Sequence, residues 1–176
     1  LKQYQNKFKY ILVDEFQDTN WAQFELVRLL AEPKNNLTVV ADDDQSIYRG
    51  RGASDSHVLQ FKDYYPQVKE VALVKNYRSR QNILDLAYSF IQNNNPERLE
   101  VKMKGLSKEL QSQVEGKGRI EHLHFVDQYE EAAGVVKKIS DLRFKPKSFD
   151  GPGISDLRWD DFAILVRSNS QANQFM

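Results

Sequence analysis

The chain contains 176 residues, of which 40% are hydrophobic and 28% are charged, a composition typical of a globular protein with a hydrophobic core in one domain or in two smaller ones. Its 25 basic residues balance its 25 acidic residues, which excludes an overall positive field that would attract a nucleic-acid backbone. The lack of cysteine excludes disulfides and thiolate metal sites, and no apolar run approaches the roughly 20 residues of a membrane span, so we expect a cytoplasmic protein with no membrane partner.

Strands and helices are predicted to alternate along the chain. Short apolar runs, most of them bounded by polar or turn residues, predict strands at 10–13, 37–41, 70–74, 120–125 and 162–166. Apolar residues recur at three-to-four spacing after Asn20, Ser79 and Asp127, which predicts a helix at each place. Because the strands are apolar at nearly every position, the pattern favours an α/β fold with a parallel sheet covered by helices on both faces.

Two segments interrupt this alternation. Residues 93–118 are polar and rich in lysine, and residues 143–153 contain proline and glycine, so both are predicted to be exposed loops. A domain boundary is expected near Lys75, where three steps of strand and helix end and the sequence NYRSRQN begins. This boundary would divide the chain into residues 1–75 and 76–176.

The first predicted strand ends in acidic residues. Asp14 and Glu15 follow its apolar run directly, and in open α/β sheets ligands bind at the carboxyl ends of the strands. A carboxylate there can hold Mg²⁺ through its water shell, and a neighbouring carboxylate can act as a base toward an attacking water. The alternative is a solvated turn in which Asp18 or Thr19 caps the helix that follows.

The second and third predicted strands also end in polar residues. The second runs into three aspartates at 42–44 and then Gln45, which predicts either a polar site shared with the first strand or a solvated acidic loop. The third leads to Tyr77, whose ring can stack, and to Arg78, whose planar guanidinium suits a terminal phosphate. The alternative for these two residues is an ordinary ion pair and the edge of a core.

Three stretches of the sequence together carry a resemblance to a known family. In order, LVDEFQDTN, VVADDDQSIYRGRGA and NYRSRQNIL closely resemble motifs II, III and IV of superfamily 1 DNA helicases of the UvrD/Rep/PcrA type. The resemblance extends weakly to DFAILVRSNSQ, which is similar to a strand of that family's second motor domain.

This resemblance implies RecA-like (P-loop NTPase) motor domains, in which helices flank a parallel sheet. Residues 1–75 would be the C-terminal half of the first motor domain, and residues 76–176 the N-terminal part of the second. Helicases of this type clamp ATP with Mg²⁺ between the two domains. They move along single-stranded DNA in the 3′ to 5′ direction, so single strands and their junctions with duplex DNA are the implied partners.

The resemblance also implies a role for each motif residue. Asp14 would coordinate Mg²⁺, and Glu15 would orient or deprotonate the hydrolytic water. Gln45 would sense the γ-phosphate and relay its presence to the DNA site. Tyr77 would stack on adenine, and Arg78 would neutralise the charge that develops on the transferred phosphoryl group.

DNA contact is implied for the segment YRGRGA. Tyr48 would stack on a base, while Arg49 and Arg51 would contribute positive charge or cation–π contacts. Gly50 stands where the family usually has an aromatic residue, often tryptophan. We therefore expect a weaker grip on DNA, because one base-stacking platform, worth about 1–3 kcal/mol, is missing.

A nucleotide motor also needs a glycine-rich phosphate loop, and the sequence contains no G-x-x-x-x-G-K-[ST]. We therefore expect an internal piece of a longer ATP-dependent helicase that does not hydrolyse ATP appreciably by itself. One alternative is a motor-derived interaction module that has lost catalysis. The other is a two-metal nuclease, whose acids Asp14, Glu15, Asp18 and 42–44 would converge within about 4 Å of a metal pair.

Overall fold

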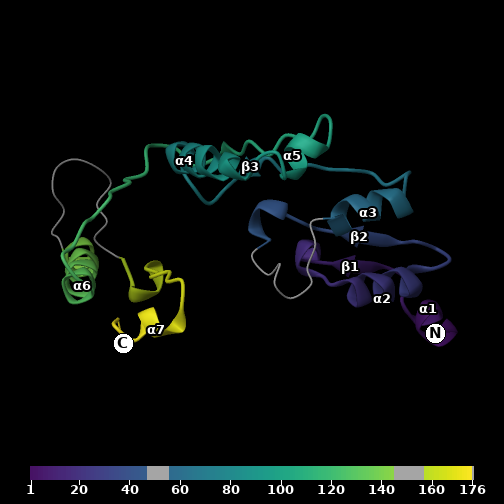
Figure 1. The fold of residues 1–176 in the computed structure, drawn as a ribbon, viewed down its shortest axis with the longest axis horizontal. Coiled ribbons are helices and arrows are strands. Elements are labelled where there is room, and N and C mark those ends of the chain that lie inside the picture. The colour runs from purple at the N-terminus through teal and green to yellow at the C-terminus, as the bar shows by residue number, and fades with distance from the viewer. Residues whose placement is uncertain (47–55, 145–156, 176) are drawn as a thin grey trace. The chain divides into compact units, whose positions relative to one another are not determined.

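The computed structural model describes residues 1–46, 56–144 and 157–175 (Figure 1). The chain divides into two compact units, Leu1–Arg119 and Ile120–Met176. Helices and two short parallel strand pairs make up the first unit, which confirms the α/β class. None of the described helices is long and apolar enough to cross a lipid bilayer.

The first part of the first unit is built around one parallel strand pair. In chain order its elements are α1 (Lys2–Lys7), β1 (Ile11–Val13), α2 (Trp21–Ala31), β2 (Leu37–Val39) and α3 (Ser56–Tyr64). Strands β1 and β2 pair in parallel, with Ile11 opposite Leu37 and Val13 opposite Val39. The strands predicted at 10–13 and 37–41 and the helix predicted after Asn20 are therefore confirmed (Figure 1).

Three phenylalanines form the core of this part. Phe16 is fully buried in the 3₁₀ turn η1 (Phe16–Asp18), and its ring meets Phe24 of α2 and Phe61 of α3 edge to face, at centroid distances of 5.7 and 5.5 Å. Such aromatic pairs contribute about 0.5–1.5 kcal/mol beyond the area that they bury. Because Phe16 comes directly after Asp14 and Glu15, this core anchors the loop that carries both acids.

Asn20 caps helix α2. Its side chain accepts a hydrogen bond from the Gln23 backbone N–H at 3.0 Å, and the Gln23 side chain accepts one from the Asn20 N–H at 2.9 Å. This reciprocal capping box satisfies two backbone donors that the helix leaves open. The alternative with Asp18 or Thr19 as the cap was wrong, and the Thr19 hydroxyl donates instead to the Phe16 carbonyl at 2.6 Å.

The strand pair is covered less than its apolar sequence predicts. Side chains alternate between the two faces of a strand, and Val13 and Val39 pack against the phenylalanine core. Leu12, which precedes Val13 in β1 and points to the opposite face, is 77% exposed. The described residues therefore do not cover both faces of this sheet as predicted.

The second part of the first unit contains a separate strand pair. Its elements are β3 (Lys75–Asn76), α4 (Gln81–Ile91), the 3₁₀ turn η4 (Gln92–Asn94), α5 (Leu99–Lys102) and β4 (Gln111–Ser112). Strands β3 and β4 pair in parallel, with Lys75 opposite Gln111. The helix predicted after Ser79 is confirmed. The strand predicted at 70–74 was wrong, because backbone pairing begins only at the Val74 carbonyl, which accepts from the Gln111 N–H at 2.7 Å.

The lysine-rich segment 93–118 is not the exposed loop that its composition predicts. It contains α5 and β4, and both Arg98 and Leu99 are buried. A charged side chain is rarely buried unless it is paired, and Asp44, which binds Arg98 through two hydrogen bonds, lies 54 positions away in the sequence. Composition alone therefore places this segment at the surface, because composition does not show which distant residue a charged side chain binds.

The second unit is mainly helical. It contains α6 (Gln128–Phe144), the 3₁₀ turn η5 (Trp159–Asp161) and α7 (Asn169–Ala172). Helix α6 confirms the helix predicted after Asp127, whereas 120–125 and 162–166 form no strand in the described part of this unit. An apolar run becomes a strand only when a second backbone pairs with it, and Leu165 is 93% exposed. Of the predicted loop 143–153, the first two residues end α6 and the rest lies outside the described residues.

Candidate functional site

Parallel pairing brings the loops after β1 and β2 to the same edge of their sheet. Beyond the strands, the Val40 N–H donates to the Val13 carbonyl and the Phe16 N–H donates to the Val40 carbonyl, both at 2.9 Å. The loop that begins with Asp14 and Glu15 is therefore held beside the loop that follows β2. This edge is where open α/β sheets bind their ligands.

The Glu15 loop has an uncommon backbone conformation. Glu15 lies in the left-handed region, at φ 48° and ψ 43°, which residues other than glycine seldom adopt. Its N–H donates to the Asp14 carboxylate at 3.0 Å. Its own carboxylate accepts a hydrogen bond of 2.6 Å from the side-chain amide of Gln17, which is 1% exposed. An exposed acid is thus held by a buried amide.

The same glutamine reaches the second loop. The Gln17 side-chain oxygen accepts a hydrogen bond from the Asp42 N–H at 3.0 Å, and the Gln45 side-chain amide donates to the Asp42 carboxylate at 2.6 Å. A continuous path of hydrogen bonds therefore runs from Glu15 through Gln17 and Asp42 to Gln45. The two loops form one polar site in which a carboxylate and an amide are placed by the same contacts.

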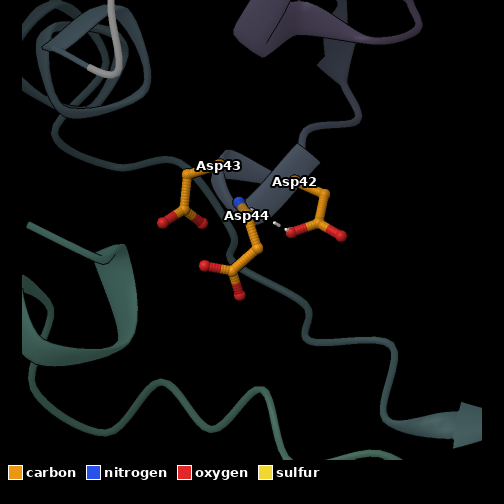
Figure 2. Close-up of side chains that lie close together, drawn as sticks. All are labelled: Asp42, Asp43 and Asp44. Carbon is orange, nitrogen blue, oxygen red and sulfur yellow. Dashed lines mark hydrogen bonds between the residues drawn. The ribbon is translucent and has the colours of Figure 1, made fainter. Parts of the chain in front are cut away.

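Three aspartates gather at the second loop, at and next to the 3₁₀ turn η2 (Asp43–Gln45) (Figure 2). One carboxylate oxygen from each of Asp42, Asp43 and Asp44 lies within 4.8 Å of the others. The Lys108 ammonium lies 2.5 Å from Asp42 and 2.7 Å from both Asp43 and Asp44. The Arg98 guanidinium binds Asp44 through two hydrogen bonds of 2.8 Å. These two cations offset most of the acidic charge.

Burial and pairing act in opposite directions on this cluster. Burial raises the pKa of Asp44, but hydrogen bonds and charge from Arg98 and Lys108 outweigh it and hold that pKa below its ordinary value. Burial lowers the pKa of Lys108, and its three carboxylate partners outweigh it and raise that pKa. The hydrogen bond to Asp44 raises the pKa of Arg98 further. All three groups are therefore charged at neutral pH.

The acids divide into two groups with different chemistry. In the part of the chain that the structure describes, the aspartates at 42–44 are the acids close enough together to share an ion, and Lys108 already lies among them. Asp14, Glu15 and Asp18 are not part of that group, so the convergence that a two-metal nuclease needs is not seen. Asp14 is exposed at the strand tip, and a carboxylate there fits a Mg²⁺ ion that keeps several waters.

Tyr77 and Arg78 lie at the end of a different strand pair. Both follow β3, and the Asn76 side chain orders the turn by accepting from the N–H groups of Arg78 and Ser79 at 3.0 and 2.8 Å. Tyr77 is 74% exposed, and Arg78 is also exposed. Within the described ranges, no hydrogen bond or ion pair joins either residue to Glu15 or to Gln45.

The predicted DNA-contacting residues Tyr48, Arg49 and Arg51 lie outside the described residues, as does Gly50. The segment that follows them is held to the first loop by His57 of α3. Its imidazole Nδ1 lies 2.9 Å from the Thr19 carbonyl, and its ring stacks on Phe24. Helix α3, which follows the predicted DNA-contacting residues in the sequence, is therefore held by a hydrogen bond to the loop that carries Glu15.

Comparison with known proteins assigns the chain to a family. A model described as the UvrD/REP helicase N-terminal domain matches residues 1–66, and one described as the UvrD-like helicase C-terminal domain matches residues 71–176. The chain belongs to the UvrD-like helicase family. This assignment confirms the resemblance that the three motifs indicate.

Individual members of the UvrD-like helicase family match nearly the whole chain. The ATP-dependent DNA helicase PcrA of Staphylococcus epidermidis is 41% identical over 172 residues, and the protein of the same name from Leuconostoc citreum is 40% identical over 173. Each match covers 98% of this chain and 21% of the relative. The chain therefore spans about a fifth of the length of these curated relatives.

Sequence reasoning missed three residues of the site in this UvrD-like helicase chain. Gln17 lies in the motif DEFQDTN, and its polar neighbours give no sign that its side chain is buried. Arg98 and Lys108 belong to the lysine-rich segment that was predicted to be exposed. Their aspartate partners are 54 and 64 or more positions away in the sequence, and no local pattern signals such a pairing.

Proposed function

We propose that this UvrD-like helicase chain forms parts of two RecA-like motor domains. Residues 1–75 would be the C-terminal half of the first domain, and residues 76–176 the N-terminal part of the second. The change from the N-terminal to the C-terminal family model between residues 66 and 71 supports a division close to Lys75. The curated relatives are named ATP-dependent DNA helicases, so the parent protein would use ATP to act on DNA.

The observation that carries this proposal is the polar site at the edge of the β1–β2 sheet. Asp14 would hold Mg²⁺ through water, and the ion would offset charge on the phosphates. Glu15 would accept a proton from, or orient, the attacking water. Gln45 lies on the neighbouring loop, where its amide would detect the γ-phosphate. Hydrogen bonds through Gln17 and Asp42 join Glu15 to Gln45, which supports a shared role for these two residues in nucleotide hydrolysis.

Two of the remaining roles rest on the exposed residues that follow β3. Tyr77 offers a free ring face for stacking on adenine. Arg78 would approach the phosphates from the second domain and neutralise charge in the transition state. Tyr48, Arg49 and Arg51 would contact single-stranded DNA, including strands at a junction with duplex. Movement would be in the 3′ to 5′ direction, and the chain alone would not turn over ATP, because it has no phosphate loop.

The test is a single substitution in the full-length protein that carries this chain. Glu15→Gln keeps the size of the side chain and the acceptor for Gln17 but removes the base. We expect the ATPase rate with single-stranded DNA to fall by about 100-fold or more, because general bases typically contribute 10²–10⁴. Nucleotide binding, measured by fluorescence titration, should change little.

Glu25→Gln is the matched control, since Glu25 lies on α2 and pairs with Arg28 away from the site. Its ATPase rate should stay within about two-fold of the parent. Equal rates in the Glu15→Gln variant and the parent would remove Glu15 from the reaction and refute the proposed function.

A further inference from the structure

Gln17 is the buried residue around which the polar site is organised. Its side chain is 1% exposed, although it comes two residues after the exposed Glu15. Its carboxamide uses both ends: the amide donates to Glu15 at 2.6 Å and the oxygen accepts from the Asp42 N–H at 3.0 Å. A buried amide is tolerated only when such bonds satisfy it.

We propose that Gln17 is a positioning residue that aims the Glu15 carboxylate and couples it to the loop that carries Gln45. This inference rests on the proposed function, in which Glu15 acts on the hydrolytic water. Gln17 itself touches neither nucleotide nor DNA in this proposal. It acts through Glu15 on one side and through Asp42 on the other.

The chemistry of the two bonds explains why a glutamine is needed. A carboxylate is acceptor-only, so the group that orients it must donate, and the backbone N–H of Asp42 must find an acceptor. A carboxamide carries a donor and an acceptor on one rigid plane, so it can make both bonds at once. Because that plane is rigid, a shift of the Asp42 backbone moves the donor that holds Glu15.

The neighbouring contacts limit how far the Glu15 loop can follow a shift of the Asp42 backbone. Phe16, between Glu15 and Gln17, is fixed in the phenylalanine core, so the backbone of the loop is anchored there. On the other side, Gln45 donates to the carboxylate of the same Asp42 at 2.6 Å. When Gln45 turns toward a γ-phosphate it gives up this bond, and the loop is released at the residue that Gln17 holds. Phosphate detection and the aim of the base are thereby linked.

A purely structural role would also explain a buried glutamine, and the variants are chosen to separate the two. Gln17→Glu keeps the size and the acceptor for the Asp42 N–H but replaces the donor with a second carboxylate beside Glu15. Gln17→Leu removes both bonds. Gln5→Leu is the matched control, because Gln5 is a partly buried glutamine that donates to the Leu29 carbonyl of α2 and makes no bond to Glu15 or Asp42 among the described residues.

The experiment measures single-stranded-DNA-stimulated ATP hydrolysis and nucleotide binding in the full-length protein. We expect kcat to fall at least about ten-fold in both Gln17 variants, a part of what the base contributes, with KM for ATP within about three-fold. Gln5→Leu should leave both kcat and KM for ATP unchanged.

The outcomes distinguish the two levels of the proposal. If Gln17→Glu keeps kcat within two-fold of the parent while Glu15→Gln loses activity, the positioning role is overturned and the proposed function stands. If Glu15→Gln itself retains the full rate, the proposed function fails and this inference fails with it. Should Gln17→Leu not fold, as its thermal melt would show, the isosteric Gln17→Glu variant decides.

Discussion

Arg98 provides the most direct test of what holds the first unit together. Its side chain is 3% exposed and binds Asp44 through two hydrogen bonds of 2.8 Å, with a third contact of 3.0 Å to Glu100. Its guanidinium carbon also lies 5.4 Å from the Tyr88 ring centroid. Arg98→Met keeps much of the apolar length and removes the charge, so Asp44 and Glu100, each with a 15% exposed side chain, lose this partner.

The expected loss follows from the burial of these acids. Removing one partner of a buried ion pair typically costs 3–5 kcal/mol, because the remaining charge stays buried without compensation. Lys108 still lies 2.7 Å from Asp44 and offsets part of that cost. We therefore expect the free energy of unfolding to fall by about 3 kcal/mol, a large share of the roughly 5–15 kcal/mol that stabilises a typical domain.

Urea denaturation of the chain, followed by Trp21 fluorescence, measures this loss in the first unit. The second tryptophan, Trp159, belongs to the other unit and is replaced by phenylalanine in both proteins, so that one transition is observed. Lys102→Met is the control, because it breaks the more exposed pair with Glu97 and should cost less than about 1 kcal/mol. A loss from Arg98→Met no larger than that of the control would refute the reasoning from burial.

Two further predictions concern the same unit. Asn20→Ala removes the cap of α2 and should lower the free energy of unfolding by about 1 kcal/mol in the same urea assay. The control Asn94→Ala, at an exposed position, should change it little. Equal losses in the two variants would contradict the capping role of Asn20. The folded-state pKa of Asp44 is lowered, so the pairing of Asp44 stabilises the folded state fully above about pH 4 and is lost as the pH falls further. The folded-state pKa of Lys108 is raised, so the contribution of Lys108 to stability is lost only when the pH exceeds about 10.5. Acid titration of unfolding should therefore be shallower in Arg98→Met than in the parent, and identical slopes would rule out this linkage.

The prediction of helices succeeded where the pattern was long and strongly periodic. The three helices expected after Asn20, Ser79 and Asp127 are present as α2, α4 and α6. The short strands were less predictable. Runs such as 120–125 and 162–166 have strand-like composition, but a strand exists only where a second backbone pairs with it, and that partner is not encoded locally.

The sequence by itself identified the helicase family through the order and spacing of its motifs. It also predicted correctly that carboxylates and an amide follow β1 and β2. The tertiary structure alone decided which of these groups are bonded to one another. It revealed that Gln17 is buried between Glu15 and Asp42, and that Lys108 and Arg98 fold back onto the aspartates from a segment that reads as surface. The reason is physical, because a polar or charged group is buried at a tolerable cost only once its partners are in place. Here Asp42, which pairs with Gln17, and the aspartates that pair with Arg98 and Lys108 come from distant parts of the chain.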